Sequence, residues 1–354
     1  KHFPIFSLEL NDNIRLFYRG GFTWLNDKYA GIEIGEGLVY DVNSLYPSQM
    51  YTRPLPYGMP IYFEGEYQKD DNYPLYLQHL RCSFELKDDK IPTIQIKKNL
   101  FFIPNEYLKS SEGEIVDLYL TNVDLELVKE HYYLFDVEYV SGWKFKAKTG
   151  LFKNFIDKWM YVKNNNTGAI RLLAKLMLNS LYGKFATNPN VTGKVPYLKE
   201  DGSLGFKTGE EEYRDPVYTP VGIFITSWAR YTTITTAQKV YDRIIYCDTD
   251  SIHLVGTDVP DAIKDRIDDN KLGYWQHECT FKRAKFLRQK TYIQEVYTKD
   301  GGTKLNVRCS GMSDKIKEKV NFDNFERGFR SYGNLKAKQV PGGVVLVDSE
   351  FTIK

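Results

Sequence analysis

Two carboxylates at the tip of an apolar hairpin constrain this chain more than any other feature of its sequence. Residues 243–255 read as strand, turn and strand, and the turn holds Asp248 and Asp250 between flanks rich in isoleucine and leucine. Two like charges this close are costly to bury, because each loses hydration and repels the other. A divalent cation removes that cost, and Mg²⁺ binds through one or two carboxylates plus substrate phosphates. An ordinary turn with exposed aspartates is the alternative that this motif alone leaves open.

The size and composition of the chain exclude several classes of protein. With 354 residues, 42% of them hydrophobic and 27% charged, we expect two or three folded domains with a large core. No apolar run reaches the roughly 18 residues of a transmembrane helix, and the first residues lack a signal-peptide pattern. The four cysteines are scattered without a C-x-x-C pair, which argues against a zinc site or a disulfide framework and favours a reducing compartment.

Net charge and aromatic content leave the partners of the chain open. The 48 basic and 46 acidic residues nearly cancel, so only local clustering of charge could mark a nucleic-acid binder. Aromatic residues make up 15% of the chain, which fits either core packing or a surface on which bases stack.

A second acidic strand end lies early in the chain. Residues 38–42 read as a buried strand, and Asp41 near its end is followed by Asn43, Ser44 and Tyr46. Asp41 could supply a third carboxylate to a site where two metal ions about 3.5–4 Å apart activate a hydroxyl and stabilise a leaving oxygen. The alternative is an acid or amide that caps a helix, beside a structural tyrosine.

A helix predicted over residues 168–182 and ended by Gly183 carries a polar face. Four side chains share that face by their spacing: Arg171, Lys175, Asn179 and Tyr182. The opposite side, which we expect to be buried, consists of Leu173, Leu176, Met177 and Leu181. Cations and an amide ending in an exposed ring suit a triphosphate with a base stacked above it, and Lys163 of the preceding helix could join them. The alternative is a solvated helix face, which leaves Tyr182 unexplained.

A basic strand is predicted within residues 281–294. It contains no acid and five basic residues, namely Lys282, Arg283, Lys285, Arg288 and Lys290. Because Arg288, Lys290 and Tyr292 alternate on one face, the strand suits contact with a phosphate backbone. A basic strand that merely faces solvent is the alternative.

The remaining segments complete the organisation of the chain. Residues 53–150 read as an insertion whose proline- and glycine-rich entry predicts a loop, followed by strand-like runs at 91–96 and 137–140 and a helix at 123–131. The other predicted elements are a helix at 151–163, a hairpin-rich protrusion at 188–216, a helix at 228–241 and a strand-rich end at 343–353.

The order of these segments resembles the family B DNA polymerases. Asp41-Val42-Asn43-Ser44-Leu45-Tyr46-Pro47 is similar to their first palm motif, D-x-x-S-L-Y-P. Residues 175–183 are similar to the fingers motif K-x-x-x-N-S-x-Y-G, residues 248–251 to D-T-D-S and residues 290–292 to K-x-Y. Tyr18-Arg19-Gly20-Gly21 resembles the Y-x-G-G linker motif, which narrows the likeness to the protein-primed branch, the phi-29-like phage polymerases.

The resemblance implies an α+β right-hand polymerase fold. It consists of a palm with an antiparallel sheet, helical fingers, a small thumb and two terminal-protein-region insertions. The implied divisions are 1–52 for the first part of the palm with the linker motif, 53–150 for the first insertion, 151–189 for the fingers, 190–212 for the second insertion, 213–309 for the second part of the palm and 310–354 for the thumb.

The resemblance also implies a role for each site residue. Asp41 and Asp250 would bind two Mg²⁺ ions together with the Val42 carbonyl, with Mn²⁺ able to substitute, and Asp248 would assist catalysis. The residues implied to bind the incoming dNTP are Tyr46, Lys163, Lys175, Asn179 and Tyr182. Tyr46 would also exclude ribonucleotides by a clash with the 2′-hydroxyl. The residues implied to contact primer and template are Tyr18, Gly20, Gly21, Thr249, Arg288, Lys290 and Tyr292.

The implied function is DNA-directed DNA synthesis, with nucleotide transfer from dNTPs to a primer 3′-hydroxyl. The branch also uses a hydroxyl of a terminal protein as primer and displaces the non-template strand. The implied partners are primer–template DNA, dNTPs and the terminal protein, for a monomer in the host cytoplasm without membrane association.

Two departures from the branch, and three rival functions, accompany this likeness. Only forty residues precede Asp41, too few for the proofreading exonuclease of the branch, and the sequence starts with lysine, so we expect the polymerase part of a longer parent. Residues 297–308 form a shorter turn than the loop of the best-known member.

The rivals are a catalytically silent nucleic-acid scaffold, a two-metal nuclease and an RNA-synthesising enzyme. The three carboxylates argue against a silent scaffold, and the predicted polar helix face has no obvious purpose in a nuclease. Tyr46 argues against RNA synthesis.

Overall fold

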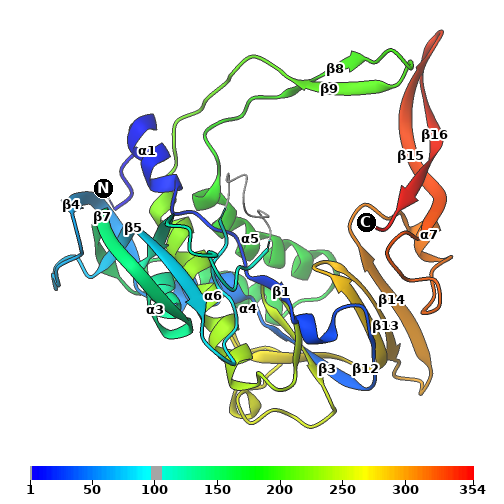
Figure 1. Ribbon diagram of the computed structural model, residues 1–354, viewed down its shortest axis with the longest axis horizontal. Coiled ribbons are helices and arrows are strands. Elements are labelled where there is room, and N and C mark those ends of the chain that lie inside the picture. The colour runs from blue at the N-terminus through cyan, green and yellow to red at the C-terminus, as the bar shows by residue number, and fades with distance from the viewer. Residues whose placement is uncertain (1, 97–105) are drawn as a thin grey trace.

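An antiparallel sheet forms the centre of the molecule. The structure is a computed structural model that describes residues 2–96 and 106–354 (Figure 1). The strands of this central sheet are, in spatial order, β1 (Thr23–Leu25), β10 (Ile244–Asp248), β11 (Ser251–Val255), β3 (Gly37–Val42), β12 (Trp275–Arg288), β13 (Thr291–Tyr297) and β14 (Thr303–Cys309), with β2 (Glu33–Ile34) paired to β12. The predicted strand at 38–42 and the predicted hairpin at 243–255 are therefore confirmed, and they are neighbours.

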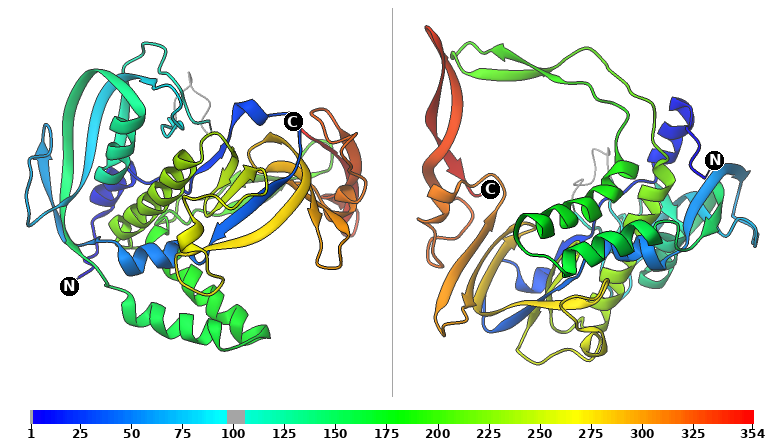
Figure 2. Two further views of the ribbon diagram at one scale, coloured as in Figure 1. Left: turned by 90° about the horizontal axis from the view of Figure 1, so that it is seen from below. Right: turned by 180° about the vertical axis from the view of Figure 1, so that it is seen from behind.

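Helices cover the central sheet and extend from it. They are α1 (Leu8–Arg15), α2 (Leu45–Thr52), α4 (Lys153–Asn164), α5 (Gly168–Ala186), α6 (Thr219–Lys239) and the short η1 (Asp27–Tyr29) and η2 (Lys264–Arg266). Helix α6 packs against the sheet through Ala229, Ile234 and Ala237, while α4 and α5 lie side by side and project from the body (Figure 2). Among the helices of the described residues, none combines the length and hydropathy needed to cross a bilayer.

A second antiparallel sheet lies within the segment 53–150. Its strands are, in spatial order, β4 (Leu55–Glu64), β7 (Tyr132–Lys148), β5 (Leu75–Leu86) and β6 (Val116–Thr121), and α3 (Asn122–His131) packs beside it. The predicted helix at 123–131 and the predicted strand at 137–140 are confirmed as α3 and part of β7. This sheet and α3 are called the insertion module below.

Two predictions for the insertion module were wrong. The proline-rich entry is not a loop but strand β4, which pairs only with β7 at the edge of the sheet, where proline costs few ladder bonds, and Gly58 lies in a register shift with φ +77°. Residues 91–96 form no strand. Side chains hold their backbone instead, since the N–H of Ile91 bonds Gln238 Oε1 and the N–H of Thr93 bonds the Tyr132 hydroxyl.

Two β-hairpins extend from the body as arms. The hairpin arm comprises β8 (Lys194–Leu198) and β9 (Leu204–Thr208), as the sequence predicted for 188–216. The C-terminal arm comprises β15 (Arg330–Val340) and β16 (Gly343–Thr352), with α7 (Asp314–Lys317) at its base. The arms meet at their tips and close a ring with the body (Figure 1), where the N–H of Gln339 bonds the carbonyl of Gly202 at 3.1 Å.

The structure corrects the predicted helices of the site. Helix α5 continues through Gly183 to Ala186, and α6 begins at Thr219 rather than at 228, because its first residues are buried on all sides and show no amphipathic period. The predicted buried face of α5 was wrong for Leu173 and Leu176, whereas Leu181 packs against the core. Ala174 and Leu178 are buried, whereas Leu173 and Leu176 are 52% and 56% exposed. Helix α5 contacts α4, α6 and α2, and Ala174 and Leu178 are the residues it buries, so the leucines that point away from these neighbours stay in solvent.

Candidate active site

The central sheet brings the three predicted aspartates together. Strand β3 pairs with β11 so that Asp41 lies opposite Ser251, and the N–H of Val42 bonds the Asp250 carbonyl at 2.8 Å. Asp248 ends β10 on the other side of the tight turn, in which Thr249 has φ +58°. All three carboxylates face one cavity of about 310 Å³, lined by Asp41, Asp248, Thr249, Asp250, Ser251, His253, Glu278 and Tyr292. Residues far apart in the sequence therefore meet as expected.

Four acidic side chains share this cavity, and burial makes their negative charge costly. Burial raises the pKa of Asp41 to about 6, and the charges of Glu278 and Asp250 add to that effect. Burial likewise raises the pKa of Asp250, with contributions from Asp248 and Glu278. Among the ion pairs of the described residues, neither Asp41 nor Asp250 takes part. A divalent cation would relieve this repulsion, and hard carboxylate and carbonyl oxygens are the donors that Mg²⁺ prefers.

The site lacks a preformed cage for an ion. In residues 2–96 and 106–354, no three histidine, cysteine or acidic side chains converge closely enough to hold a metal. Asp41 and Asp250 line the cavity and offer carboxylate oxygens of the kind that a divalent ion prefers, whereas the predicted contribution of the Val42 carbonyl stays a prediction.

Asp248 differs from the other two aspartates because protein groups already hold it. Lys290 Nζ lies 2.7 and 2.8 Å from its two carboxylate oxygens, and the Tyr246 hydroxyl donates to it at 3.1 Å. The N–H of Lys290 also bonds that hydroxyl at 3.0 Å. These bonds favour Asp248 as an orienting group rather than a primary metal ligand.

Glu278 is a fourth carboxylate that the sequence motifs missed. It lies in β12 where the register against β3 shifts between His277 and Cys279, two residues past Gln276, the partner of Asp41. No motif marks this residue. Only the pairing of β12 with β3 could have placed it beside Asp41, and pairing between distant strands cannot be read from local pattern.

The predicted phosphate-binding cations lie on α4 and α5, close to Asp41. Lys163 is 7% exposed, and its Nζ donates to Asn43 Oδ1 at 2.6 Å and Ser44 Oγ at 3.1 Å. Burial, together with the nearby charges of Arg171 and Lys175, lowers the pKa of Lys163 to about 8. Lys175 is exposed on α5 near enough to Asp41 to lower the pKa of that carboxyl. Asn179 is exposed one turn further along α5.

Three tyrosines meet where α5 approaches the body. The rings of Tyr46 and Tyr182 lie 4.4 Å apart, and the hydroxyls of Tyr18 and Tyr182 are 2.6 Å apart. Burial raises the pKa of Tyr46 to about 12. The segment from Tyr18 to Gly21 passes the turn of residues 248–250, named the catalytic turn below for the role proposed there, because a Cβ on Gly21 would lie 2.7 Å from Thr249 Oγ1. That contact explains a glycine at 21. No neighbour lies within 4 Å of a Cβ at Gly20.

The basic strand β12 and its partner β13 border the cavity. Tyr292 lines it and stacks on Phe286 with ring centroids 4.9 Å apart, while burial raises the pKa of Tyr292 to about 12. Arg288 ends β12 and is exposed. Lys290 occupies the turn between the two strands with φ +56°. The prediction of one strand within 281–294 with Arg288, Lys290 and Tyr292 alternating on one face was therefore wrong, because a turn at 289–290 separates two antiparallel strands; Tyr292 lines the cavity.

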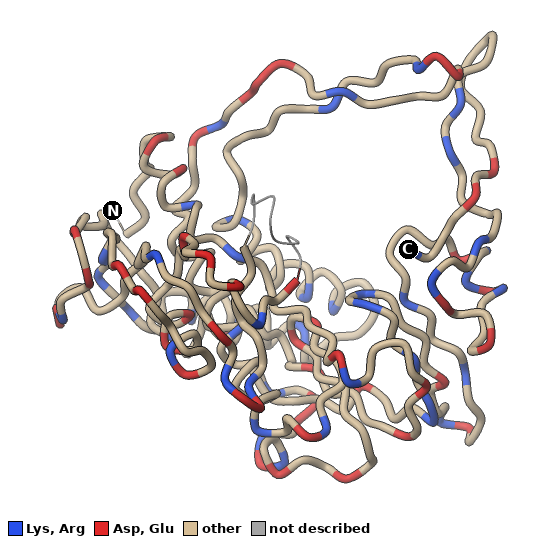
Figure 3. Tube along the Cα trace, in the orientation of Figure 1, with Lys and Arg blue, Asp and Glu red and all other residues tan. Residues whose placement is uncertain are grey.

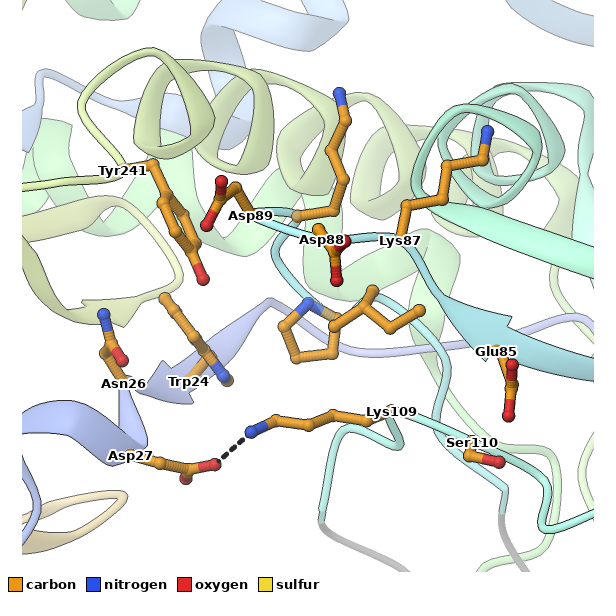
Figure 4. A pocket seen from close by; sticks show the side chains of 13 residues that line it. Trp24, Asn26, Asp27, Glu85, Lys87, Asp88, Asp89, Lys109, Ser110 and Tyr241 are labelled. Atoms are coloured by element: carbon orange, nitrogen blue, oxygen red, sulfur yellow. Dashed lines mark hydrogen bonds and ion pairs between the residues drawn. The ribbon is translucent and has the colours of Figure 1, made fainter.

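A larger cavity of about 460 Å³ lies outside this site, between β1 and the insertion module (Figure 4). Trp24 and Tyr241 contribute rings to it, and Lys109 bridges its edge with an ion pair to Asp27 at 2.7 Å. None of the residues that line it belongs to the predicted site.

Comparison with known proteins identifies the class of this chain. The family model for DNA polymerase type B, organellar and viral, matches residues 1–268, so the chain belongs to that family. It is 68% identical over 367 residues to the DNA polymerase of Bacillus phage Nf, 66% identical over the same length to that of Bacillus phage phi29, and 39% identical over 361 residues to that of Streptococcus phage Cp-1. These alignments cover 99–100% of this chain but 62–64% of the relatives, so the chain spans less than two thirds of their length.

A solved structure agrees with this assignment. Phi29 DNA polymerase complexed with primer-template DNA and incoming nucleotide substrates superposes with a TM-score of 0.95 at 66% identity, over 100% of this chain and 64% of that one. The binary complex with primer-template DNA gives a TM-score of 0.93. The expected mixed α and β fold with antiparallel sheets is confirmed, whereas the right-hand subdivision stays a prediction.

Magnesium is expected to stabilise the folded chain more at pH 8 than at pH 5. The pKa of Asp41 is raised from 3.8 to about 6, so the folded state binds more protons than the unfolded state between those values. The metal-free fold therefore loses stability as the pH rises through that window. Below pH 6 an ion must displace a proton, which weakens binding about tenfold per unit.

Thermal unfolding with and without Mg²⁺ from pH 5 to pH 8 measures this effect. Asp41→Asn should remove most of the magnesium-dependent rise in the unfolding midpoint, while the exposed Asp265→Asn should retain it. An equal rise at pH 5 and pH 8, or one unchanged in Asp41→Asn, would contradict the assignment of Asp41.

Proposed function

We propose that this chain is the catalytic part of a DNA-directed DNA polymerase that transfers nucleotides from dNTPs to a primer 3′-hydroxyl. The observation that carries the proposal is the meeting of Asp41 and Asp250 at one cavity, near the buried Lys163, which bonds Asn43, and the Lys290–Asp248 pair. Carboxylates beside cations suit a reaction in which phosphate charge must be neutralised and a hydroxyl positioned for in-line attack.

Asp41, Asp250 and the Val42 carbonyl would hold the divalent ions. Bound Mg²⁺ supplies Lewis-acid stabilisation of the phosphate oxygens and lowers the pKa of the attacking hydroxyl. Lys290 keeps Asp248 in a fixed orientation beside that centre through two bonds of 2.7 and 2.8 Å. Tyr292, on the rim, would support the primer end.

Lys163 and Lys175 would neutralise the triphosphate, with Arg171 and Asn179 on the same helix. Lys163 Nζ bonds Asn43 and Ser44 in this structure. A phosphate would therefore compete for the Lys163 ammonium group with neutral oxygens, not with a carboxylate. The rings of Tyr46 and Tyr182, tilted by 33° with centroids 4.4 Å apart, occupy the place proposed for the sugar and base. Binding of a dNTP would therefore require α5 to move relative to α2, with Tyr182 then packing on the base and Tyr46 under the sugar.

The two arms would surround duplex DNA. Basic residues lie along both of them (Figure 3), with Lys194, Lys199 and Lys207 in or beside the hairpin arm and Lys336 and Lys338 on β15. Salt-dependent contact with phosphates needs such charges and no base recognition. Under this proposal residues 1–52 and 213–309 form the palm, 151–189 the fingers, 310–354 the thumb, and 190–212 the second insertion, which would support processivity and strand displacement.

The insertion module, within residues 53–150, would contact a terminal protein whose hydroxyl serves as primer. Support for this part is the likeness to phage polymerases and the module's own sheet and core, separate from the central sheet. We propose the host cytoplasm as the working compartment because the relatives are phage polymerases.

A primer-extension assay tests the proposal. A fluorescent hairpin primer is incubated with the chain, Mg²⁺ and either dNTPs or NTPs. Growth of the primer with dNTPs supports the polymerase. Shortening without growth would indicate the rival nuclease, no change would indicate a silent scaffold, and equal growth with NTPs would indicate RNA synthesis.

A disulfide across the arm tips is expected to trap DNA in the ring. Ser203 and Lys338 are antiparallel bridge partners, a spacing that permits a disulfide. In the variant Ser203→Cys with Lys338→Cys, oxidation after loading on a circular primed template should slow dissociation by about a hundredfold or more, because leaving then requires opening a covalent ring.

Filter retention in high salt measures that dissociation. Ser203→Cys alone is the control, and addition of reductant should restore wild-type release. Rapid release from the oxidised double variant would contradict the ring arrangement.

A further inference from the structure

We propose that the buried ion pair between Asp124 of α3 and Arg230 of α6 is a positioning device for the nucleotide site. Through it, the insertion module would hold the linker segment, residues 18–21, between the catalytic turn and α5. The catalytic consequence rests on the proposed function, but the structural claim does not.

The pair is closed off from solvent and fully bonded. Arg230 Nη2 lies 2.6 Å from Asp124 Oδ2 and Arg230 Nε lies 3.0 Å from Oδ1, with the two side chains 5% and 8% exposed. The Ser227 hydroxyl donates to Asp124 Oδ2 at 2.9 Å, and Thr121 adds a further bond at 3.1 Å. Burial alone would raise the pKa of Asp124, but the charges of Arg230 and Arg19 hold it below its ordinary value. The carboxylate is therefore a fixed anchor.

The third nitrogen of the guanidinium points away from Asp124, toward the linker segment. Arg230 Nη1 donates to the carbonyls of Arg19 at 3.0 Å and Gly20 at 2.7 Å. A planar guanidinium can serve an acid on one edge and two carbonyls on another, which a lysine ammonium cannot reproduce. The Asp124 carboxylate thus fixes the orientation of the Arg230 guanidinium, and the guanidinium fixes two consecutive backbone carbonyls.

The linker segment held in this way touches both sides of the nucleotide site. Its Tyr18 hydroxyl meets that of Tyr182 on α5 at 2.6 Å. The carbonyl of Phe22, directly after the segment, accepts the N–H of Thr249 in the catalytic turn at 2.6 Å. Gly21 lies against the Thr249 side chain. A shift of the two anchored carbonyls would therefore move both the turn between Asp248 and Asp250 and the rest position of Tyr182.

Stability alone does not account for this arrangement. Buried ion pairs contribute little net stability compared with apolar packing, since both charges lose hydration. What the pair provides is geometry, because the Arg230 guanidinium on α6 bonds two other segments of the chain, α3 through Asp124 and the linker through Arg19 and Gly20.

Hydrogen exchange of the substrate-free chain tests the inference. In Arg230→Lys, a charge partner for Asp124 is retained but the bonds to Arg19 and Gly20 are lost. Amide exchange in the peptide 18–22 and at Thr249 is expected to become roughly tenfold faster, with the rest of α6 unchanged. The matched control is Arg243→Lys, since Arg243 also donates to two carbonyls, of Val255 and Asp258, at the other end of the β10–β11 hairpin. Unchanged exchange at 18–22 and Thr249 in a folded Arg230→Lys would overturn the inference.

Ser227→Ala is a gentler variant that keeps both charges and the fold. It removes one bond to each partner of the pair and should accelerate the same exchange by about threefold. In extension assays Arg230→Lys should raise the KM for dNTP about tenfold with a smaller change in kcat, which a general loss of folding would not produce. If exchange becomes faster in Arg230→Lys but the wild-type chain does not extend primers, this inference stands and the proposed function is rejected.

Discussion

Asp250→Ala is expected to abolish nucleotide incorporation, by about ten-thousandfold or more, while the affinity for primer–template DNA should change little. The reason is that Asp250 shares its cavity with Asp41, carries no ion-pair partner within the described residues, and would supply half of the carboxylate charge that holds the divalent ions. Without that charge neither attack nor departure of the leaving oxygen is stabilised, and two-metal chemistry depends on both.

Single-turnover extension and an equilibrium binding assay measure the two effects separately. The exposed Asp265→Asn is the matched control, because it removes the same charge from the surface without touching the cavity. Activity within tenfold of wild type in Asp250→Ala would refute its place at the centre of the reaction. Loss of DNA binding in parallel with activity would indicate instead that the carboxylate supports the fold.

Tyr46→Val is expected to admit ribonucleotides, with a fall of about a hundredfold in the preference for dNTPs over NTPs. Tyr46 lies in the first turn of α2, and its partly buried ring packs against that of Tyr182. In that place the ring would exclude a 2′-hydroxyl through a steric clash. Removing the ring removes the clash, so the variant should accept NTPs. A hundredfold change in discrimination corresponds to about 2.7 kcal/mol.

The ratio of kcat/KM for dNTP and NTP on the same hairpin primer measures this preference. Tyr51→Val, one helical turn and a half further along α2, is a control that shortens a tyrosine outside the cavity. If Tyr46→Val lowers kcat/KM for dNTP and kcat/KM for NTP by the same factor, the ring supports the site without selecting the sugar.

Much of the site could be predicted from short sequence patterns. The acidic turn and the strand that contains Asp41 are marked by apolar residues around charged ones, and this contrast survives in the structure as buried strands ending at a shared cavity. The helices that carry Lys163 and Lys175 were also predicted, because charged and apolar residues alternate with a helical period.

Other features could not be predicted because they depend on which segments become neighbours. Leu173 and Leu176 of α5 were assigned to the wrong side, since the sequence gives a helix its periodicity but not the partner that it packs against. Strand β4 tolerates its prolines because it lies at a sheet edge, and the edge is a property of the assembled sheet. Glu278 reaches the carboxylates only through the pairing of β12 with β3.

The sequence by itself determined which residue types the chemistry has available: three aspartates, two lysines and a tyrosine, in an order shared with type B DNA polymerases. Only the tertiary structure decided which carboxylates are unpaired, which one Lys290 holds, and how Arg230 ties the insertion module to the catalytic turn. The physical reason is range. Hydrophobic period and turn chemistry act over a few residues, whereas desolvation, ion pairing and strand register arise only when distant segments exclude water from one another.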